Sequence, residues 1–529
     1  MAFEPRVSPA LEFSTEERSA YARLGLQPIA AADIEATVAA MIEHAAYHIN
    51  EDWLRALRFG HDREESERGR AIYRLILQNA AAASAARRPT CQDTGQAVVF
   101  VDLGQEAVVV GGRLEEAVNR GVAKGYKTLR ASVVSDPLFA RKNTKDNTPA
   151  VLHTRLVPGR AIHVHVAEKG FGSENKSFMT MYPYPGGGTK AVGELVVAGI
   201  AKAGADWCPP GSISVAVGGN FEQAPLMAKR ALLEPFDMDL LLDRAKVHPE
   251  SLTVEEKFRI ELFEAVNALG LGPQGLGGTT AVVDVKLTTA PTHIAGLPVA
   301  VNVQCNKAHH LDAVLDGSGP VTSFPRPDVA PYLAGLDADG GADTVLRIKL
   351  PLDERTRKSL RAGQRLLLTG KLLTARDAAH KRMIETLDRG ERLPVELAGQ
   401  LVYYVGPVDP LPGEVVGSAG PTTASRMDPY TPRLLRETGL AGTIGKSERG
   451  AAVVAAIKET GTIYMIAVGG AGYVQSRCIR SVKVLAYGEL GTEAIRELEV
   501  EDFPVVVAVD SDGNNLHQSG RLAFASSPH

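Results

Sequence analysis

Apolar residues recur at helical spacing in the first part of the chain. Between residues 31 and 88, Ile34, Val38 and Ile42 return every fourth residue with few helix breakers, which is the pattern of amphipathic helices. From residue 97 the pattern changes to β-branched runs that are typical of strands, separated by further helical stretches. We expect strands over 161–170, 212–219, 280–287 and 298–305, and helices over 114–125, 192–203, 223–233 and 254–269. This alternation predicts an α/β fold on a mixed sheet.

A second domain is expected near the carboxyl end. Residues 316–343 are rich in Pro, Gly and Asp and have no periodicity, as in linkers between domains. After them, short strands are expected over 345–350, 365–370, 400–406, 463–470, 481–488 and 505–510, with helices over 378–387 and 450–459. We therefore predict an N-terminal domain over 1–330 with helices and a mixed sheet, a linker over 331–344, and a smaller C-terminal α/β domain over 345–529.

Composition excludes several classes of protein. The 529 residues are 44% hydrophobic and 23% charged, which is close to the globular average and unlike disordered or fibrous chains. The charge balance of 58 Lys and Arg against 62 Asp and Glu gives −4, too even to indicate nucleic acid or an anionic membrane as a partner. The N-terminal residues lack the pattern of a signal peptide, and no apolar run is long enough to span a bilayer. We expect a cytoplasmic protein.

Three of the four cysteines lie where ligands are usually found. Cys91 lies at a helix-to-strand junction, Cys208 begins a turn with two prolines, and Cys305 ends a predicted strand. Three thiolates far apart in sequence can converge on an iron–sulfur cluster and leave one iron open to substrate. A zinc site with three thiolates and a histidine is the alternative, although structural zinc ligands usually come in close pairs. Cys478 has apolar neighbours and is interpreted as a core thiol.

Two further patterns have weaker implications. The run from Gly270 to Gly275 matches G-x-G-x-x-G, but a helix precedes it and a strand follows, which is the reverse of a dinucleotide site. We interpret it as a turn where backbone segments approach closely. His163 and His165 share one face of a strand and could ligate a metal, but polar residues facing outward are the commoner reason for such a pair.

The second domain supplies cations and hydroxyl groups among small residues. Residues 420–428 read Gly-Pro-Thr-Thr-Ala-Ser-Arg-Met-Asp, Gly445 precedes Lys446, and Arg376 lies earlier in the domain. Backbone amides and guanidinium groups in such loops can hold a carboxylate through paired hydrogen bonds. The chemistry favours a pocket for a small acid, with a plain capping loop as the alternative.

Together these motifs resemble one known family. CQDTG from residue 91, GSENKS from 172, CPPGSISVAVGG from 208, GPQGLGG from 272, THIAGLPVAVNVQC from 292, LTARDAAHKRM from 373 and GPTTASRMD from 420 are similar to class I, iron–sulfur-dependent fumarate hydratases and their L-tartrate dehydratase relatives. The motifs follow the family order across nearly the whole chain. The resemblance implies a fused form of the α and β parts that some members carry as separate subunits.

The resemblance also implies a set of site residues. Cys91, Cys208 and Cys305 would hold a [4Fe-4S] cluster with one labile iron that acts as a Lewis acid. Thr422 is implied as the base, with Asp93 taking part in proton transfer; because a threonine hydroxyl is a poor base, Asp93 is the rival for this role. The remaining implied residues bind substrate between the two domains: Gln92, Arg130, Gly172, Asn175, Lys176, Ser177, His293, Arg376, Arg426 and Lys446.

By this resemblance the expected activity is the reversible hydration of fumarate to L-malate, a reaction of the tricarboxylic acid cycle, in a homodimer. Ser425 stands where the family commonly has glycine, and Ser447 and Glu448 follow Lys446 where a smaller residue is common. Because one altered contact changes binding of a related acid by only ~1–3 kcal/mol, mesaconate or tartrate remains an alternative substrate. A cluster-bearing sensor without turnover is the alternative from another class of protein.

Overall fold

The computed structural model describes residues 20–526, apart from 22, 184–186, 308 and 337–344. The chain forms two compact units, and each combines segments that are separate in sequence. The first unit contains the described residues up to Asn50, Asp93–Phe171 and His309–Pro327, and the second contains Glu51–Gln92, Gly172–Ala308 and the chain from Asp328 onwards. Both units are of the predicted α/β class. The predicted domain boundaries at 330 and 345 stay a prediction, and residues 337–344 of the predicted linker lie outside the described residues.

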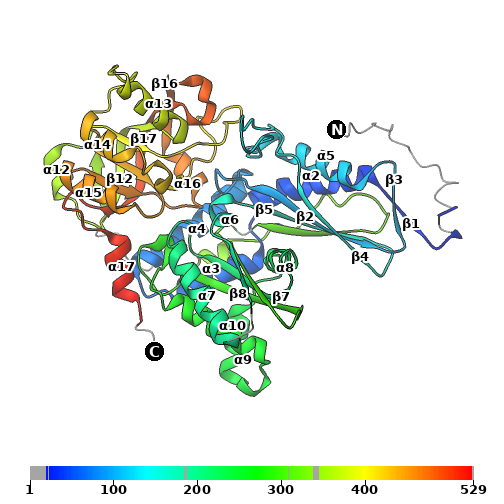
Figure 1. Cartoon of the computed structure of the whole chain (residues 1–529). Helices are drawn as coiled ribbons and strands as arrows, with labels where there is room; N and C mark the ends of the chain where they lie inside the picture. The colour runs from blue at the N-terminus through cyan, green and yellow to red at the C-terminus, as the bar shows by residue number, and fades with distance from the viewer. Residues whose placement is uncertain (1–19, 22, 184–186, 308, 337–344, 527–529) are drawn as a thin grey trace. The chain divides into compact units, whose positions relative to one another are not determined.

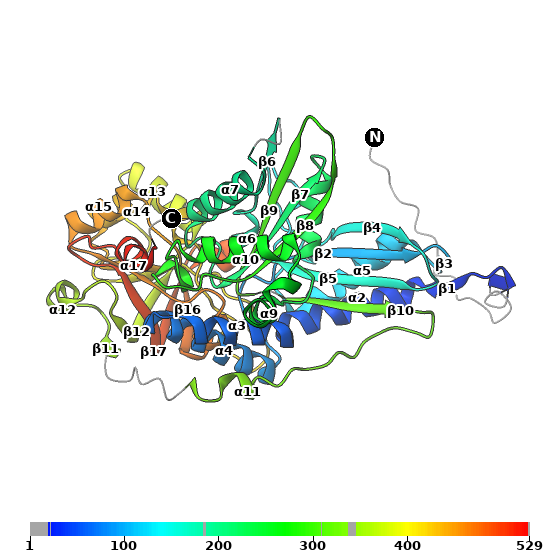
Figure 2. The ribbon, with the colours of Figure 1, turned by 90° about the horizontal axis from the view of Figure 1, so that it is seen from below.

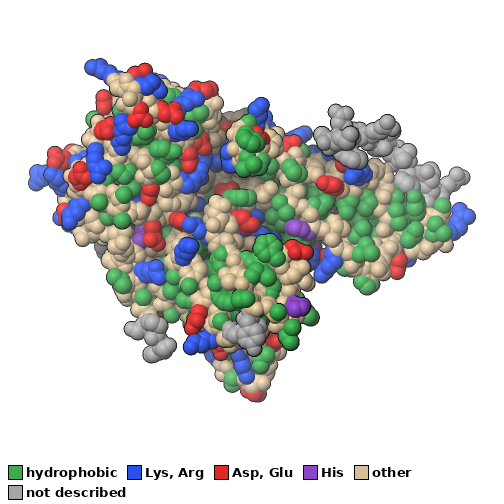
Figure 3. All heavy atoms as spheres, viewed as in Figure 1, with side chains coloured by type: hydrophobic (Ala, Val, Ile, Leu, Met, Phe, Trp, Pro, Cys, Tyr) green, Lys and Arg blue, Asp and Glu red, His purple; other side chains and the backbone are tan. Residues whose placement is uncertain are grey.

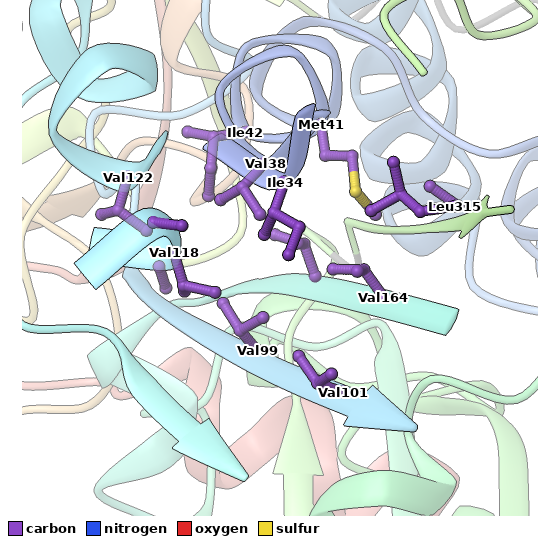
Figure 4. Packing of buried hydrophobic residues seen from close by; sticks show 14 of the residues in the cluster. Ile34, Val38, Met41, Ile42, Val99, Val101, Val118, Val122, Val164 and Leu315 are labelled. Atoms are coloured by element: carbon purple, nitrogen blue, oxygen red, sulfur yellow. The ribbon is translucent and has the colours of Figure 1, made fainter. Parts of the chain in front are cut away.

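The first unit packs two helices on one face of a four-stranded sheet (Figure 1). The strand order is β10-β5-β2-β4, and β4 is parallel to β2 while β5 is antiparallel to it. Apolar side chains of α2 and α5, including Val38 and Val118, meet Val99 and Val164 of the sheet (Figure 4). The elements are β1 (Gln27–Ala30), α2 (Ala31–Tyr47), β2 (Gln96–Gly104), β3 (Ala107–Val110), α5 (Leu114–Gly125), β4 (Val151–Val157), β5 (Ile162–Lys169) and β10 (His310–Leu315).

The second unit contains a four-stranded sheet with helices on both faces. Its order is β6-β9-β7-β8, and Figure 2 shows α7 and α10 beside these strands. Ile213 and Val215 of β7 face α7 and α10, whereas the small Ala216 packs against α8 on the other face. The elements are α3 (Glu51–Arg63), α4 (Glu67–Ala86), α6 (Phe171–Glu174), β6 (Phe178–Tyr182), α7 (Gly188–Ala203), β7 (Gly211–Gly219), α8 (Gln223–Ala231), α9 (Met238–Val247), α10 (Val254–Asn267), β8 (Val282–Thr292) and β9 (Leu297–Gln304).

Side-chain caps explain where two of these helices begin. The Ser66 hydroxyl accepts a hydrogen bond from the Gly69 amide at the start of α4. Thr253 and Glu256 form a reciprocal capping box at the start of α10. Such caps satisfy amides that have no partner inside the helix. The structure confirms the helix predicted from residue 254 and the helices predicted between residues 31 and 88.

The remaining strands of the second unit form a seven-stranded sheet. Five of these strands close into a ring, and β11 and β16 pair at its outside. β12, β13, β14 and β15 are parallel neighbours, and β17 pairs with both β15 and β12. Pairing at both sides of β17 leaves this five-stranded ring without an open edge. The elements are α11 (Ala330–Leu333), β11 (Val345–Lys349), α12 (Glu354–Ser359), β12 (Arg365–Thr374), α13 (Asp377–Asp388), β13 (Leu401–Tyr403), α14 (Thr431–Thr438), β14 (Gly442–Gly445), α15 (Ala451–Thr460), β15 (Ile463–Ile466), α16 (Gly472–Arg477), β16 (Ile479–Ala486), β17 (Ile495–Val509) and α17 (Leu516–Phe524).

The glycine-rich run at 270–278 is a turn that meets another backbone segment, as predicted. A Cβ atom at Gly277 would lie 2.3 Å from the carbonyl oxygen of Gly520, in the C-terminal helix α17. A Cβ atom at Gly270 would lie 2.4 Å from the Ala525 amide nitrogen. Only glycine allows such approaches of one backbone to another. The glycines of this run therefore allow α17 to pack closely against the turn.

The surface carries charges of both signs. On the face drawn in Figure 3, Lys and Arg side chains are interspersed with Asp and Glu, in keeping with the balanced net charge of −4. Within the described part of the chain, no helix has both the length and the apolar character that a membrane span requires.

Candidate active site

Two residues of the predicted motifs and one glycine follow the carboxyl ends of parallel strands. Arg376 comes two residues after β12 ends, Lys446 directly follows β14, and Gly469 comes three residues after β15. The carboxyl ends of parallel strands lie at one edge of a sheet, which is where α/β proteins commonly bind ligands. This edge of the ring therefore defines a candidate site within the second unit.

A buried lysine lies at a group of three thiols. The Lys446 ammonium donates a hydrogen bond to Cys208 Sγ at 2.8 Å, and both side chains are buried. Burial alone would lower the pKa of Lys446, but Cys208, Cys91 and Cys305 outweigh it and raise this pKa. Burial raises the pKa of Cys208 to about 11, against the opposing effect of Lys446. The three predicted ligands thus share one electrostatic environment.

Cys208 and two residues of neighbouring segments adopt a left-handed backbone conformation, which residues other than glycine rarely take. The φ angles are 61° at Cys208, 56° at Gln274 and 72° at Ser447. Such conformations persist only where surrounding contacts hold them, and they concentrate at functional sites. Ser447 directly follows Lys446, and the Ser447 hydroxyl donates to the carbonyl of Ala205 at 3.3 Å.

The predicted base lies on a loop that is tied to the lysine segment. The amide of Lys446 donates to the Thr422 carbonyl at 3.2 Å, and the amide of Ala424 donates to the Lys446 carbonyl at 2.9 Å. Thr422 is 7% exposed. The Gln92 side-chain amide donates to the Pro421 carbonyl at 3.0 Å and accepts from Cys91 Sγ at 3.1 Å. Gln92 therefore joins the first cysteine to the Thr422 loop.

Two predicted arginines both lie close to the carboxylate of Asp377. Arg426 makes a two-pronged ion pair with Asp377, with contacts of 2.9 and 2.6 Å. The buried Arg376 lies 3.8 Å from Asp377 and 3.4 Å from Glu493. Carboxylates of the chain thus lie against both guanidinium groups, which are groups of the kind that bind carboxylates through paired hydrogen bonds.

A buried ion pair supports the two loops that carry Thr422 and Lys446. Arg449 donates to Asp428 at 2.8 Å, and its guanidinium lies over the rings of Tyr404 and Tyr464. Asp428 closes the predicted 420–428 motif, and Arg449 comes three residues after Lys446. The Arg449 side chain is fully enclosed, so this pair holds the two loops in a fixed relation.

The GSENKS motif contributes unequally to this site. A Cβ atom at Gly172 would lie 3.5 Å from Lys446 Nζ, so this glycine borders the lysine. Lys176 forms an ion pair with Asp206 at 2.5 Å, two residues before Cys208. Ser177 accepts a hydrogen bond from the Val303 amide at 3.1 Å, and Asn175 is exposed. Gly172 and Lys176 thus lie beside the site, while Ser177 anchors the motif to β9.

Three further predicted site residues lie in the first unit or on an exposed turn. Asp93 and Arg130 belong to the first unit, where the two Asp93 carboxylate oxygens accept from the amides of Gly95 and Phe171, each at 3.1 Å. The Arg130 carbonyl accepts from the Thr94 hydroxyl at 2.6 Å. His293 is exposed on the turn between β8 and β9. The roles of these three residues stay predictions.

The remaining candidates have structural roles. His165 pairs with Asp312 at 2.5 Å, and its partner candidate His163 is exposed. Cys478 packs against the core of the closed sheet, as predicted, and burial raises its pKa to about 11. Among the described residues, no three His, Cys, Asp or Glu side chains are spaced to hold a single metal ion.

Two family profiles together match most of the chain. The family profile described as fumarate hydratase (fumerase) matches residues 35–314, and the one described as fumarase C-terminus matches residues 328–520. The first of these alone covers more than half of the chain. The chain is therefore a member of the fumarate hydratase family.

Individual relatives are similar over most of their length. Fumarate hydratase 2 of Leishmania major is 31% identical over 88% of this chain and 82% of its own. The aerobic class I fumarate hydratase of Escherichia coli K12 is 32% identical over 87% of this chain and 85% of its own. A Methanocaldococcus jannaschii protein whose name assigns it to the alpha subunit of L(+)-tartrate dehydratase is 31% identical over 51% of this chain.

Three buried side-chain amides in segments next to the cysteines were not predicted from the sequence. Gln274, Asn306 and Asn79 are each buried, and each hydrogen-bonds to the segment around Gly469 and Gly470. Gln274 was visible only as part of a glycine-rich turn. Asn306 directly follows Cys305, and a buried amide beside a ligand is the signal that could have identified it.

Proposed function

We propose that this chain is a hydro-lyase that interconverts fumarate and L-malate by reversible hydration. Membership of the fumarate hydratase family supports the reaction class. The observation that carries the proposal is the buried Lys446, hydrogen-bonded to Cys208 and in the field of Cys91 and Cys305. A buried cation beside three thiols, two of them buried and one half-buried, suits a cluster and an anionic substrate together.

The residues present fit a [4Fe-4S] cluster. Cys91, Cys208 and Cys305 would hold it, since thiolates are the usual ligands of such clusters. Gly469 keeps this region open, because a Cβ atom there would lie 3.1 Å from Cys208 Sγ. When bound, the cluster would supply a Lewis acid that makes hydroxide a feasible leaving group.

The cations of the chain would hold the two carboxylates of the diacid. Arg376, Arg426 and Lys446 follow strand ends or lie on the adjoining loop, and guanidinium groups bind carboxylates through paired hydrogen bonds. Negative charge builds on one carboxylate when the C3 proton of malate leaves, and these fixed cations stabilise it. Gln92 and Gly172 would line the same pocket.

Proton removal from C3 is assigned to Thr422, with Asp93 as the rival. The Thr422 hydroxyl makes no hydrogen bond to another described residue, which leaves it available to substrate. A base must come within hydrogen-bond reach of the proton. Thr422→Val and Asp93→Asn variants separate the two roles, because the variant that lacks the base loses the acidic limb of the pH–rate profile, where the rate rises as the base deprotonates. Arg130, Asn175, Lys176, Ser177 and His293 stay proposed substrate-binding residues.

The test is fumarate hydration by the full chain after anaerobic reconstitution with iron and sulfide. The absorbance of the fumarate double bond should fall as malate forms. Cys208→Ser should abolish both the visible cluster spectrum and turnover, whereas the matched Cys478→Ser variant should keep both. An intact cluster spectrum without turnover would favour the sensor, and colourless active enzyme containing zinc would contradict the cluster.

A related diacid is the second candidate substrate. The similarity to the protein named as a tartrate dehydratase subunit favours including tartrate. A panel of fumarate, mesaconate and L-tartrate, compared by kcat/KM, ranks the candidates directly. We further propose that the protein is a cytoplasmic homodimer that serves the tricarboxylic acid cycle. Size-exclusion chromatography with light scattering tests whether it is a dimer.

A further inference from the structure

One loop contacts the segments of all three predicted cluster ligands. It spans residues 467–471 between β15 and α16, and α16 packs beside α4 (Figure 1). We propose that this loop is the template that sets the spacing of the three cysteines, and that Gln274, Asn306 and Asn79 are positioning residues that fasten each cysteine segment to it. The role of the loop in cluster binding rests on the proposed function, whereas the hydrogen bonds described below are observed in the structure.

Gln274 fastens the segment of Cys208. Its backbone amide and its side-chain amide both donate to the Pro209 carbonyl, each at 2.8 Å. Its side-chain oxygen accepts from the Gly469 amide, also at 2.8 Å. One side chain that is 2% exposed therefore joins the turn after Cys208 to the loop.

Asn306 fastens the segment of Cys305, which it directly follows. Its side-chain amide donates to the Gly469 carbonyl at 2.7 Å. Its backbone carbonyl accepts from the Trp53 indole at 2.9 Å. A Cβ atom at Gly470 would lie 1.9 Å from the Asn306 side-chain oxygen, and the φ angle of Gly470 is 88°. The loop needs glycine here because Asn306 occupies that space.

Asn79 and Gly472 fasten the segment of Cys91. The Asn79 side chain donates to the carbonyls of Thr90 and Gly470, at 2.9 and 3.0 Å. Its oxygen accepts from the amides of the two residues after Gly472, at 3.0 and 2.9 Å. The Gly472 amide itself donates to the Thr90 carbonyl at 3.0 Å.

The arrangement explains how distant ligands reach one centre. The cysteines are separated by about a hundred residues each, so nothing local in the chain fixes their spacing. Each amide makes hydrogen bonds in a buried setting, where losing one leaves polar groups unsatisfied. Groups that orient ligands without contacting the metal commonly change its affinity by about 10- to 100-fold.

The test compares Gln274→Ala and Asn306→Ala with Asn267→Ala in the reconstituted full chain. Asn267 is a matched control, because it is also a buried amide, bonded to Ala281 and Val282. We expect the two loop variants to lose iron to a chelator about tenfold faster than wild type, or faster still, as the visible absorbance decays. Wild-type rates in both variants, or equal acceleration in the control, would overturn the proposal.

A second measurement uses the cluster-free chain and is independent of the proposed function. Iodoacetamide labelling followed by peptide mass spectrometry gives the alkylation rate of each cysteine. We expect Gln274→Ala to speed labelling of Cys208 and Asn306→Ala to speed labelling of Cys305, each several-fold and without affecting Cys478. Unchanged rates would overturn the template. If the wild-type protein acquires no cluster spectrum on reconstitution, the proposed function is contradicted. The alkylation rates still test the role of the loop, because they are measured without the cluster.

Discussion

At the scale of single residues, the contact between Lys446 and Cys208 affects both the stability of the fold and the chemistry of the proposed site. A buried ammonium without a partner would be costly, and a buried thiolate equally so. Their hydrogen bond at 2.8 Å lets each stabilise the charged form of the other. The sequence identified both residues separately, but their contact depends on the approach of two segments 238 residues apart.

Removing this ammonium should make Cys208 harder to deprotonate. The pKa of Cys208 is about 11 because of burial, and Lys446 opposes that rise. In Lys446→Met we expect this pKa to increase further, and turnover to fall about 100-fold or more, as when a charge-stabilising donor is removed. The pH dependence of Cys208 alkylation in cluster-free protein measures the first effect.

Lys446→Arg is the matched control for that change, because it keeps the charge but alters the geometry. We expect its Cys208 alkylation profile to stay near that of wild type. If Lys446→Met and wild type were alkylated with the same pH profile, the ion-pair interpretation would be wrong.

At the scale of elements, helix α17 is held by backbone contacts that only glycine permits. Gly277 has a φ angle of 86°, and a Cβ atom there would lie 2.3 Å from the Gly520 carbonyl oxygen. His517 of the same helix shares a hydrogen bond of 2.8 Å with the Gly275 carbonyl. The glycine-rich turn, Gln274 and the C-terminal helix therefore form one supporting assembly.

Gly277→Ala should destabilise the protein far more than the same substitution at a glycine whose Cβ position is unobstructed. Gly399 has a φ angle of 72° but no heavy atom within 4 Å of its Cβ position, so Gly399→Ala isolates the cost of a left-handed backbone at alanine, about 1–2 kcal/mol. We expect Gly277→Ala to cost at least about 2 kcal/mol more, because the helix must shift. Urea midpoints of the two variants provide the comparison, and equal midpoints would contradict the close contact.

The elements themselves were the most predictable feature. The expected helices over 114–125 and 254–269 appear as α5 and α10, and the strand expected over 212–219 is β7. Periodicity reports which face of an element is buried, and this is a local property. The closure of the last sheet through β17 was not predicted, because pairing partners depend on chain segments far apart in sequence.

At the scale of the whole molecule, stability should respond to pH through two buried groups with opposite effects. Burial lowers the pKa of His380 to about 4 and raises that of Asp284 to about 6. His380 binds a proton more readily when unfolded, so its contribution to stability is lost as the pH falls from about 6.5 towards 4. Asp284 binds its proton more readily when folded, so its contribution to stability grows as the pH falls through 6.

His380→Asn should remove the acid-sensitive part of this response. An asparagine can keep the donor that His380 directs to the Arg376 carbonyl, at 2.8 Å, but it does not titrate. Between pH 7.5 and pH 5, His380 accounts for a loss of about 2 kcal/mol. We therefore expect the urea midpoint of His380→Asn to fall less on acidification than that of wild type, and an equal fall would contradict a depressed His380 pKa.

The sequence by itself determined the α/β elements, the family motifs and the chemical types of the site residues, because periodicity, turn composition and residue chemistry are written locally. Only the tertiary structure decided that Lys446 meets Cys208, that Gln274 and Asn306 fasten one loop, and that α17 covers the glycine-rich turn. These contacts join residues at least 163 positions apart in the sequence. Their geometry depends on how sheets close and helices pack, which no local pattern records.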